Sequence, residues 1–295
     1  MRRFFLSPGE PRLRAGWRLL FQGVLWFALT MVFGLILIVF YYIKPSDSLS
    51  LLIYQSISFL AITTSIYLAR RYIDRRSFSS LGLVVNRQAL RDVLVGIAIA
   101  GVMMGIIFTV EWSVGWLSFG GFAWQVQSPL EFLGGMLVML ITFIIVGWQE
   151  ELLSRGYWLQ NLSDGLNLRW GVLLSSGLFA ILHLMNPGAS WFAIMGLVAA
   201  GLFLAYGYVR THQLWLPIGL HIGWNFFEGA IFGFPVSGFT GLPKLINQVV
   251  QGPVILTGGS FGPEAGLVLL PGLFLGVILV YLVTSNRTKG TGDMG

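Results

Sequence analysis

Glu150-Glu151-Leu152-Leu153-Ser154-Arg155 is the stretch of sequence that decides what this chain can fold into. It follows an apolar run, residues 141–149, next to which two adjacent carboxylates are energetically costly. A charge at the centre of a membrane helix costs roughly 2.5 kcal/mol or more unless it pairs or faces a polar cavity. Glu151 and Arg155 have the i,i+4 spacing at which an ion pair closes on one helix face. Glu150 points about 100° away around the same helix. The pattern therefore predicts a Glu151–Arg155 brace and leaves Glu150 free for chemistry.

The composition places this stretch in a bilayer. Hydrophobic residues make up 56% of the 295 residues and charged residues only 10%, and the mean hydropathy is +0.79. Soluble domains of this length do not have such a composition. The chain has no cysteine, which excludes a disulfide scaffold, a thiolate nucleophile and a Cys-ligated metal. We predict an all-α, polytopic integral membrane protein that forms one domain over residues 1–295.

Apolar runs of about 17–25 residues predict eight transmembrane helices. They are Leu19–Ile43, Leu49–Ala69, Val93–Val110, Leu130–Leu152, Trp170–Met185, Trp191–Val209, Leu214–Phe232 and Gly266–Val283. All Lys and Arg residues except Lys44 and Lys244 fall on one side of this arrangement. The positive-inside rule makes that side, and with it both termini, cytoplasmic. We therefore expect a prokaryotic plasma-membrane protein, and since the membrane explains the net charge of +6, no nucleic-acid partner.

Two connecting segments are expected on the outer side. Residues 112–127 are rich in Trp and Phe, which is typical of an interfacial aromatic belt. Residues 233–263 are rich in Gly and Pro and are predicted to form a loop. Glu264 follows that loop and is expected to cap the last helix.

Polar residues of three predicted helices are expected to meet. His183 ends Phe179-Ala-Ile-Leu-His183, and His221 opens His221-Ile-Gly-Trp-Asn225, which places His221 and Asn225 on one helix face. At a rise of about 1.5 Å per residue, the depths of Glu150, His183 and His221 in the membrane overlap. We therefore predict a polar cavity that contains these side chains and opens to the cytoplasmic side.

These residue types suit peptide-bond hydrolysis. A carboxylate and an imidazole that share one water can turn that water into a nucleophile. A second imidazole and an amide can donate hydrogen bonds to the oxyanion of a tetrahedral intermediate. Glu150, His183 and His221 could instead bind Zn²⁺, which would itself lower the pKa of the water. An aspartyl mechanism is excluded, because every Asp lies outside the predicted spans.

Three motifs together resemble one known family. Glu-Glu-x-x-x-Arg, Phe-x-x-x-His and His-x-x-x-Asn, in this order on separate predicted helices, are similar to those of the CPBP family. That family comprises type II CAAX prenyl endopeptidases and bacteriocin-processing (Abi) membrane proteins. The motifs lie within residues 130–230. The resemblance implies an intramembrane endopeptidase that acts on a membrane-associated protein or peptide.

The resemblance also implies a role for each motif residue. Glu150 and His183 would activate the water, and His221 with Asn225 would hold the oxyanion. The remaining motif residues would support the site structurally: Glu151, Arg155 and Phe179. A rival interpretation is a non-catalytic membrane protein of the immunity or scaffold type, which would use the same cavity to hold a partner segment. Such a protein should tolerate Glu150→Gln, whereas a protease should not.

Overall fold

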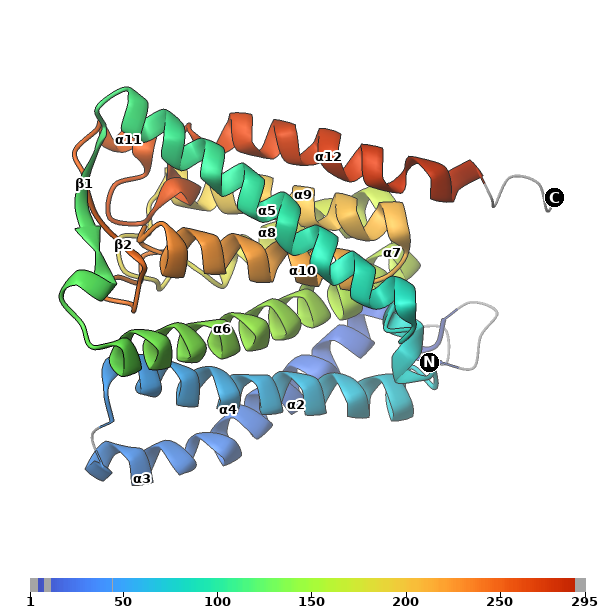
Figure 1. Ribbon diagram of the computed structural model, residues 1–295. Coiled ribbons are helices and arrows are strands. Elements are labelled where there is room, and N and C mark those ends of the chain that lie inside the picture. The colour runs from blue at the N-terminus through green and yellow to red at the C-terminus, as the bar shows by residue number, and fades with distance from the viewer. Residues whose placement is uncertain (1–4, 8–11, 44, 290–295) are drawn as a thin grey trace.

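The computed structural model describes residues 5–7, 12–43 and 45–289, and these are mostly helical (Figure 1). The main helices are α2 (Ala15–Gly34), α3 (Ile36–Ile43), α4 (Asp47–Leu68), α5 (Arg87–Ser113), α6 (Pro129–Glu151), α7 (Leu159–Gly165), α8 (Leu168–Ile181), α9 (Trp191–Thr211), α10 (Trp215–Asn225) and α12 (Leu269–Lys289). Short helical segments are η2 (Phe78–Leu81), η3 (Ala123–Gln125), α11 (Val254–Thr257) and η6 (Pro263–Ala265). The predictions for Arg2, Arg3, Lys44 and the two chain ends lie outside the described residues.

The helices are those of an integral membrane protein. Within the described residues, five helical stretches are long and apolar enough to cross a bilayer: Ala15–Ile38, Asp47–Ile73, Arg87–Ser113, Pro129–Gly165 and Trp191–Thr211. Leu168–Ile181 and Leu269–Ser285 are shorter apolar helices. Large apolar side chains lie on the outside of the molecule, with Leu130 83% and Trp191 80% exposed. Such a surface needs lipid as its solvent.

Three π-helical segments extend α-helices of the predicted spans. η1 (Ala69–Ile73) continues α4, η4 (Leu152–Trp158) joins α6 to α7, and η5 (Phe226–Ile231) continues α10. A π segment shifts the helix register and is frequently found at functional sites. Here η4 begins directly after Glu151 and η5 directly after Asn225, so each starts next to a motif residue.

Helices α5 and α10 pack with their backbones in contact. A Cβ atom built on Gly219 would lie 2.3 Å from the Val93 carbonyl oxygen, and one on Gly96 would lie 2.6 Å from the Leu220 nitrogen. Small residues at a helix interface permit this close approach in membranes. Any side chain at Gly219 or Gly96 would push α10 away, so these glycines fix the position of the helix that carries His221.

The two ends of the helices differ, as Figure 1 shows. At the strand end, β1 (Leu117–Phe122) pairs antiparallel with β2 (Ile246–Val250), with Leu117 opposite Val250. The arginine end is the opposite end: it holds residues 70–91, which form the connection from α4 to α5 and the first turns of α5. The described residues are mostly helical, consistent with the all-α prediction, which did not include this two-stranded sheet. The strands come from the predicted aromatic belt and the predicted Gly/Pro-rich loop, and their pairing is long-range, so neither segment by itself signals it.

Candidate active site

The carboxylate of Glu150 lies between two imidazole rings. Its Oε2 atom is 3.8 Å from His183 Nε2 and 3.7 Å from His221 Nε2. These separations exceed the 2.7–3.2 Å range of a direct hydrogen bond. Among the described residues, this buried Oε2 atom has no hydrogen-bond partner. The arrangement leaves a position at which one water could contact the carboxylate and an imidazole at once.

Each ring is held through its Nδ1 atom. In the turn after α8, His183 Nδ1 is 2.9 Å from the Phe179 carbonyl oxygen. A carbonyl only accepts, so Nδ1 carries the proton. On α10, His221 Nδ1 is 2.8 Å from Glu151 Oε1. Both rings therefore turn Nε2 toward Glu150. The predicted fifth span was Trp170–Met185, but α8 ends at Ile181, and His183 lies two residues beyond it.

Glu151 and Arg155 form the ion pair that their spacing predicted. Arg155 Nη1 donates to Glu151 Oε1 over 2.8 Å, and both side chains are fully buried. Arg155 Nη2 also donates to the Gly201 carbonyl oxygen on α9, at 2.8 Å. The pair thus joins α6 and its π extension to α9. Because Glu151 also contacts His221 Nδ1, the ion pair orients an imidazole of the site in addition to neutralising two buried charges.

Phe179 packs against three of these groups. The Arg155 guanidinium lies over its ring, 4.7 Å from the centroid. The same ring is 4.9 Å from the His183 ring and meets the His221 ring edge-on at 6.0 Å. An aromatic face under a buried cation is favourable. Phe179 therefore fills the space behind the two imidazoles, and its own carbonyl orients one of them.

A cavity of about 310 Å³ contains the predicted motif residues. Glu150, His183, His221 and Asn225 all line it, so it brings together side chains of α6, α10 and the turn after α8. Other polar side chains of its wall are Gln55, Ser58, Thr142, Gln149, Asn186, Ser237 and Glu264. Trp26, Tyr54 and Leu182 form part of its apolar wall.

The cavity extends in a direction that the sequence did not predict. Its wall includes Val236, Phe239 and Leu242 from the loop at the strand end, rather than residues 70–91 of the arginine end. Toward the arginine end, a buried apolar cluster closes the space. Its members are Ile62, Ile66, Ala69, Leu81, Leu83, Leu152, Leu153, Tyr157, Leu214, Ile218 and Ile222. The predicted opening on this side is not confirmed, because this apolar cluster, the hydrophobic plug, lies there.

Sequence reasoning missed Ser237 and Glu264 as part of the cavity wall. Glu264 was expected to cap the last helix, but it lies in η6, before α12 begins at Leu269, and is only 5% exposed. Ser237 Oγ donates to Glu264 Oε2 over 2.5 Å. Burial raises the pKa of the Glu264 carboxyl, and the Ser237 hydrogen bond opposes this rise. Both residues lie in a Gly/Pro-rich segment without helical or strand periodicity, which gave no signal.

The geometry does not match a bound Zn²⁺ ion. Tetrahedral ligands at 2.0–2.1 Å from zinc are about 3.3 Å apart, whereas Glu150 Oε2 is 3.7–3.8 Å from the two imidazole nitrogens. Within the described part of the chain, no group of three or more His, Asp or Glu is arranged to hold a metal. The chemistry derived below therefore uses only side chains and water.

Apolar helices surround a largely buried site of one carboxylate and two imidazoles. The chain is therefore an integral membrane protein, and its site contains residue types that hydrolases use. Residues 132–227 match the family model of the Rce1-like type II CAAX prenyl endopeptidases. This segment runs from α6 into η5 and holds the three motifs. The match therefore lies where the motifs resemble those of the CPBP family, and the matching model is that of a family of endopeptidases.

A curated protein is similar to most of the chain. The chain is 25% identical over 210 residues to a Bacillus subtilis (strain 168) protein named "Putative membrane peptidase YdiL". The match covers 69% of this chain and 81% of that protein. No solved structure matches the chain significantly.

Proposed function

We propose that this protein is an intramembrane endopeptidase that hydrolyses a peptide bond of a membrane-associated protein or peptide. The observation that carries the proposal is the position of Glu150 between two imidazoles that are both oriented by buried partners. A scaffold protein needs a polar cavity but has no need for two rings aimed at one carboxylate.

In the proposed reaction, Glu150 is the general base. A water between Glu150 Oε2 and His183 Nε2 gives its proton to the carboxylate, and its oxygen attacks the carbonyl carbon of the scissile bond. The tetrahedral intermediate collapses when the C–N bond breaks and the proton held by Glu150 passes to the leaving nitrogen. The products are a carboxylic acid and an amine, so one water is consumed and Glu150 returns to its starting state.

His221 and Asn225 are the proposed oxyanion donors. The carboxylate of Glu151 on Nδ1 stabilises positive charge on the His221 ring, so that Nε2–H can donate to the oxygen. Asn225, one helical turn further along α10, lines the same cavity and supplies an amide donor. Glu151 and Phe179 contact the imidazoles, and Arg155 contacts Glu151 and the Phe179 ring, so these three are positioning residues.

The proposed topology keeps eight membrane crossings. The five long stretches are supplemented by α8, by α10 with η5, and by α12. With the arginine end cytoplasmic, as the positive-inside rule requires, the cavity faces the outer half of the bilayer. The substrate is then a segment that lies in or on the membrane. The name of the matching family, the CAAX prenyl endopeptidases, agrees with this, because a prenyl group anchors a protein to a membrane.

The test maps new protein N-termini by mass spectrometry in membranes that contain wild-type protein or Glu150→Gln. The matched control is Glu131→Gln, the same substitution at an exposed position in the first turn of α6. We expect termini that depend on Glu150 and are unaffected by Glu131→Gln. Their loss with a strong chelator would indicate Zn²⁺ instead of the metal-free route. Identical termini in all three membranes, with equal amounts of folded protein, would favour the non-catalytic scaffold.

A further inference from the structure

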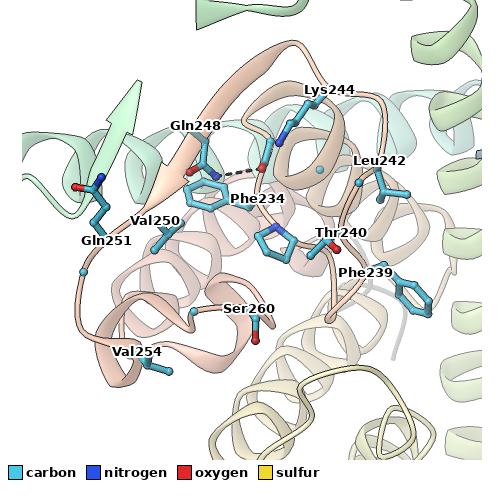
Figure 2. A pocket seen from close by; sticks show the side chains of 16 residues that line it. Phe234, Phe239, Thr240, Leu242, Lys244, Gln248, Val250, Gln251, Val254 and Ser260 are labelled. Atoms are coloured by element: carbon cyan, nitrogen blue, oxygen red, sulfur yellow. Dashed lines mark hydrogen bonds between the residues drawn. The ribbon is translucent and has the colours of Figure 1, made fainter. Parts of the chain in front are cut away.

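A second cavity, of about 360 Å³, lies at the strand end and takes no part in the proposed hydrolysis. We refer to it as the strand-end pocket (Figure 2). Its wall is formed by the loop from Gly233 to Ser260, together with Gly229 of η5. Phe234, Val250 and Val254 make part of the wall apolar, and Thr240, Gln248, Gln251 and Ser260 contribute polar side chains.

The strand-end pocket carries one positive charge and no negative one. Lys244 lines it, and its wall includes no Asp or Glu. Figure 2 shows the Lys244 side chain pointing toward Gln248, whose amide donates to the Gly233 carbonyl over 3.1 Å. Among the described residues, no carboxylate is placed to form an ion pair with Lys244. The charge of this pocket therefore complements an anionic group supplied from outside the chain.

The strand-end pocket adjoins the Glu150 cavity. Phe239 and Leu242 line both of them, so these two side chains form the shared wall. A ligand that occupies the Glu150 cavity and extends toward the strand end reaches the pocket next. Since the Glu150 cavity is closed by the apolar cluster on its other side, this is the direction in which an extended substrate can continue.

The length of helix α6 gives the distance between Glu150 and the strand-end pocket. A Cβ atom built on Gly135 would lie 2.9 Å from Pro243 Cβ, so the residue before Lys244 packs beside Gly135. At about 1.5 Å per residue, α6 separates Gly135 from Glu150 by about 22 Å. An extended peptide advances about 3.3 Å per residue and covers this distance in about six or seven residues.

We propose that the strand-end pocket is a substrate subsite in which Lys244 binds a carboxylate about six or seven residues from the bond that Glu150 hydrolyses. This inference rests on the proposed function and adds a substrate class to it: chains with an acidic side chain or a C-terminal carboxylate at that spacing. Ion pairing in a partly enclosed pocket with amide neighbours gives such a carboxylate a charge-assisted hydrogen bond.

The test measures peptide binding to full-length Glu150→Gln protein in nanodiscs of neutral phosphatidylcholine. The probes are Leu/Ala peptides of one length with a neutral fluorophore: one ends in an amidated Asp, one in Asn with a free carboxylate, and one in an amidated Asn. Binding is followed by fluorescence anisotropy. We expect at least one carboxylate peptide to bind about five- to tenfold more tightly than the neutral peptide, and the peptide that does so identifies the source of the carboxylate.

Variants of Lys244 decide the assignment. Lys244→Gln should remove the preference and Lys244→Arg should retain it, while Arg169→Gln, an exposed position at the other end of the molecule, should leave it unchanged. Equal affinities for all three peptides, or a preference that survives Lys244→Gln, would overturn the inference. Binding is measured without hydrolysis, so the two proposals fail separately. Glu150-dependent termini without the carboxylate preference would contradict only the proposed subsite. A carboxylate preference without Glu150-dependent termini would contradict only the proposed protease activity.

Discussion

The Glu150 cavity and the strand-end pocket have similar volumes, about 310 and 360 Å³, but they are built differently. The cavity takes its motif side chains from α6, α10 and the turn after α8, and buried partners orient both of its imidazoles. The strand-end pocket is formed by a loop that turns at Gly233, Gly241 and Gly259, all with positive φ. Only Lys244 brings charge to it.

The difference separates chemistry from binding. A reacting water must be held to within a fraction of an ångström, which requires side chains whose own rotamers are fixed by packing and hydrogen bonds. A subsite for an extended peptide needs only shape and complementary charge, and a loop can supply both. Substitutions around Glu150 should therefore act on the rate of hydrolysis, whereas substitutions in the strand-end loop should act on affinity and stability.

The largest effect is expected from the two histidines that face Glu150. We expect His183→Ala and His221→Ala each to lower kcat by about 10³-fold or more, because each removes a group that contacts the water or the oxyanion. The measurement is the cleavage rate of a substrate identified from the mapped termini, with purified protein in lipid.

The third histidine provides the control. His212 lies at the end of α9 in an exposed position, so His212→Ala should retain the wild-type rate within about twofold. A rate for His183→Ala close to that of His212→Ala would contradict the proposed role of His183. Activity that survives both active-site variants would place the chemistry elsewhere in the molecule.

A smaller effect is expected for Glu151→Gln, which changes the group that orients His221 without touching the substrate. We expect kcat to fall by about 10- to 100-fold, with KM little changed, because the ring loses its carboxylate partner while the cavity keeps its shape. The buried Arg155 also loses its counter-charge, so the melting temperature should fall.

The split between kcat and KM distinguishes positioning from folding. A purely structural Glu151 would reduce the amount of folded protein but leave kcat of the folded fraction unchanged. Glu131→Gln on the same helix controls for the substitution itself, since among the described residues its side chain hydrogen-bonds to Ser128 alone, in the exposed first turn of α6.

The sequence predicted the parts of the site that depend on local spacing. The Glu151–Arg155 ion pair follows from one helical turn, and the depths of Glu150, His183 and His221 follow from counting along separate helices. The side chains line one cavity. What they contribute to catalysis remains a prediction.

The parts that depend on long-range contacts were not predicted. Neither Leu117 nor Val250 indicates its partner strand, so the small sheet was not part of the otherwise consistent all-α prediction. The contact of Ser237 with Glu264 joins two positions of an irregular segment. The direction of the cavity depends on where Leu81 and Leu214 pack, and hydropathy shows that they are apolar but not that they form a plug.

The smallest effect, a shift in melting temperature, is expected for Gly233→Ala in the strand-end loop. Gly233 has φ +73, and a Cβ atom there would lie 2.2 Å from the Ile246 carbonyl oxygen of β2. The left-handed backbone alone costs a residue with a Cβ roughly 1–2 kcal/mol, and the overlap with Ile246 adds to it. About 1 kcal/mol corresponds to about 2–4 °C in a chain of a few hundred residues.

Gly241→Ala separates the two contributions, because Gly241 has nearly the same φ of +74 but no atom within 4 Å of its Cβ position. The melting temperature of Gly241→Ala should fall only by the cost of the left-handed backbone. The melting temperature of Gly233→Ala should fall further, because the overlap with Ile246 is added. Equal shifts would mean that β2 does not press against the turn at Gly233. The loop wall would then be looser than the structure shows, and the spacing between Lys244 and Glu150, which depends on how this loop is held against α6, would lose its support.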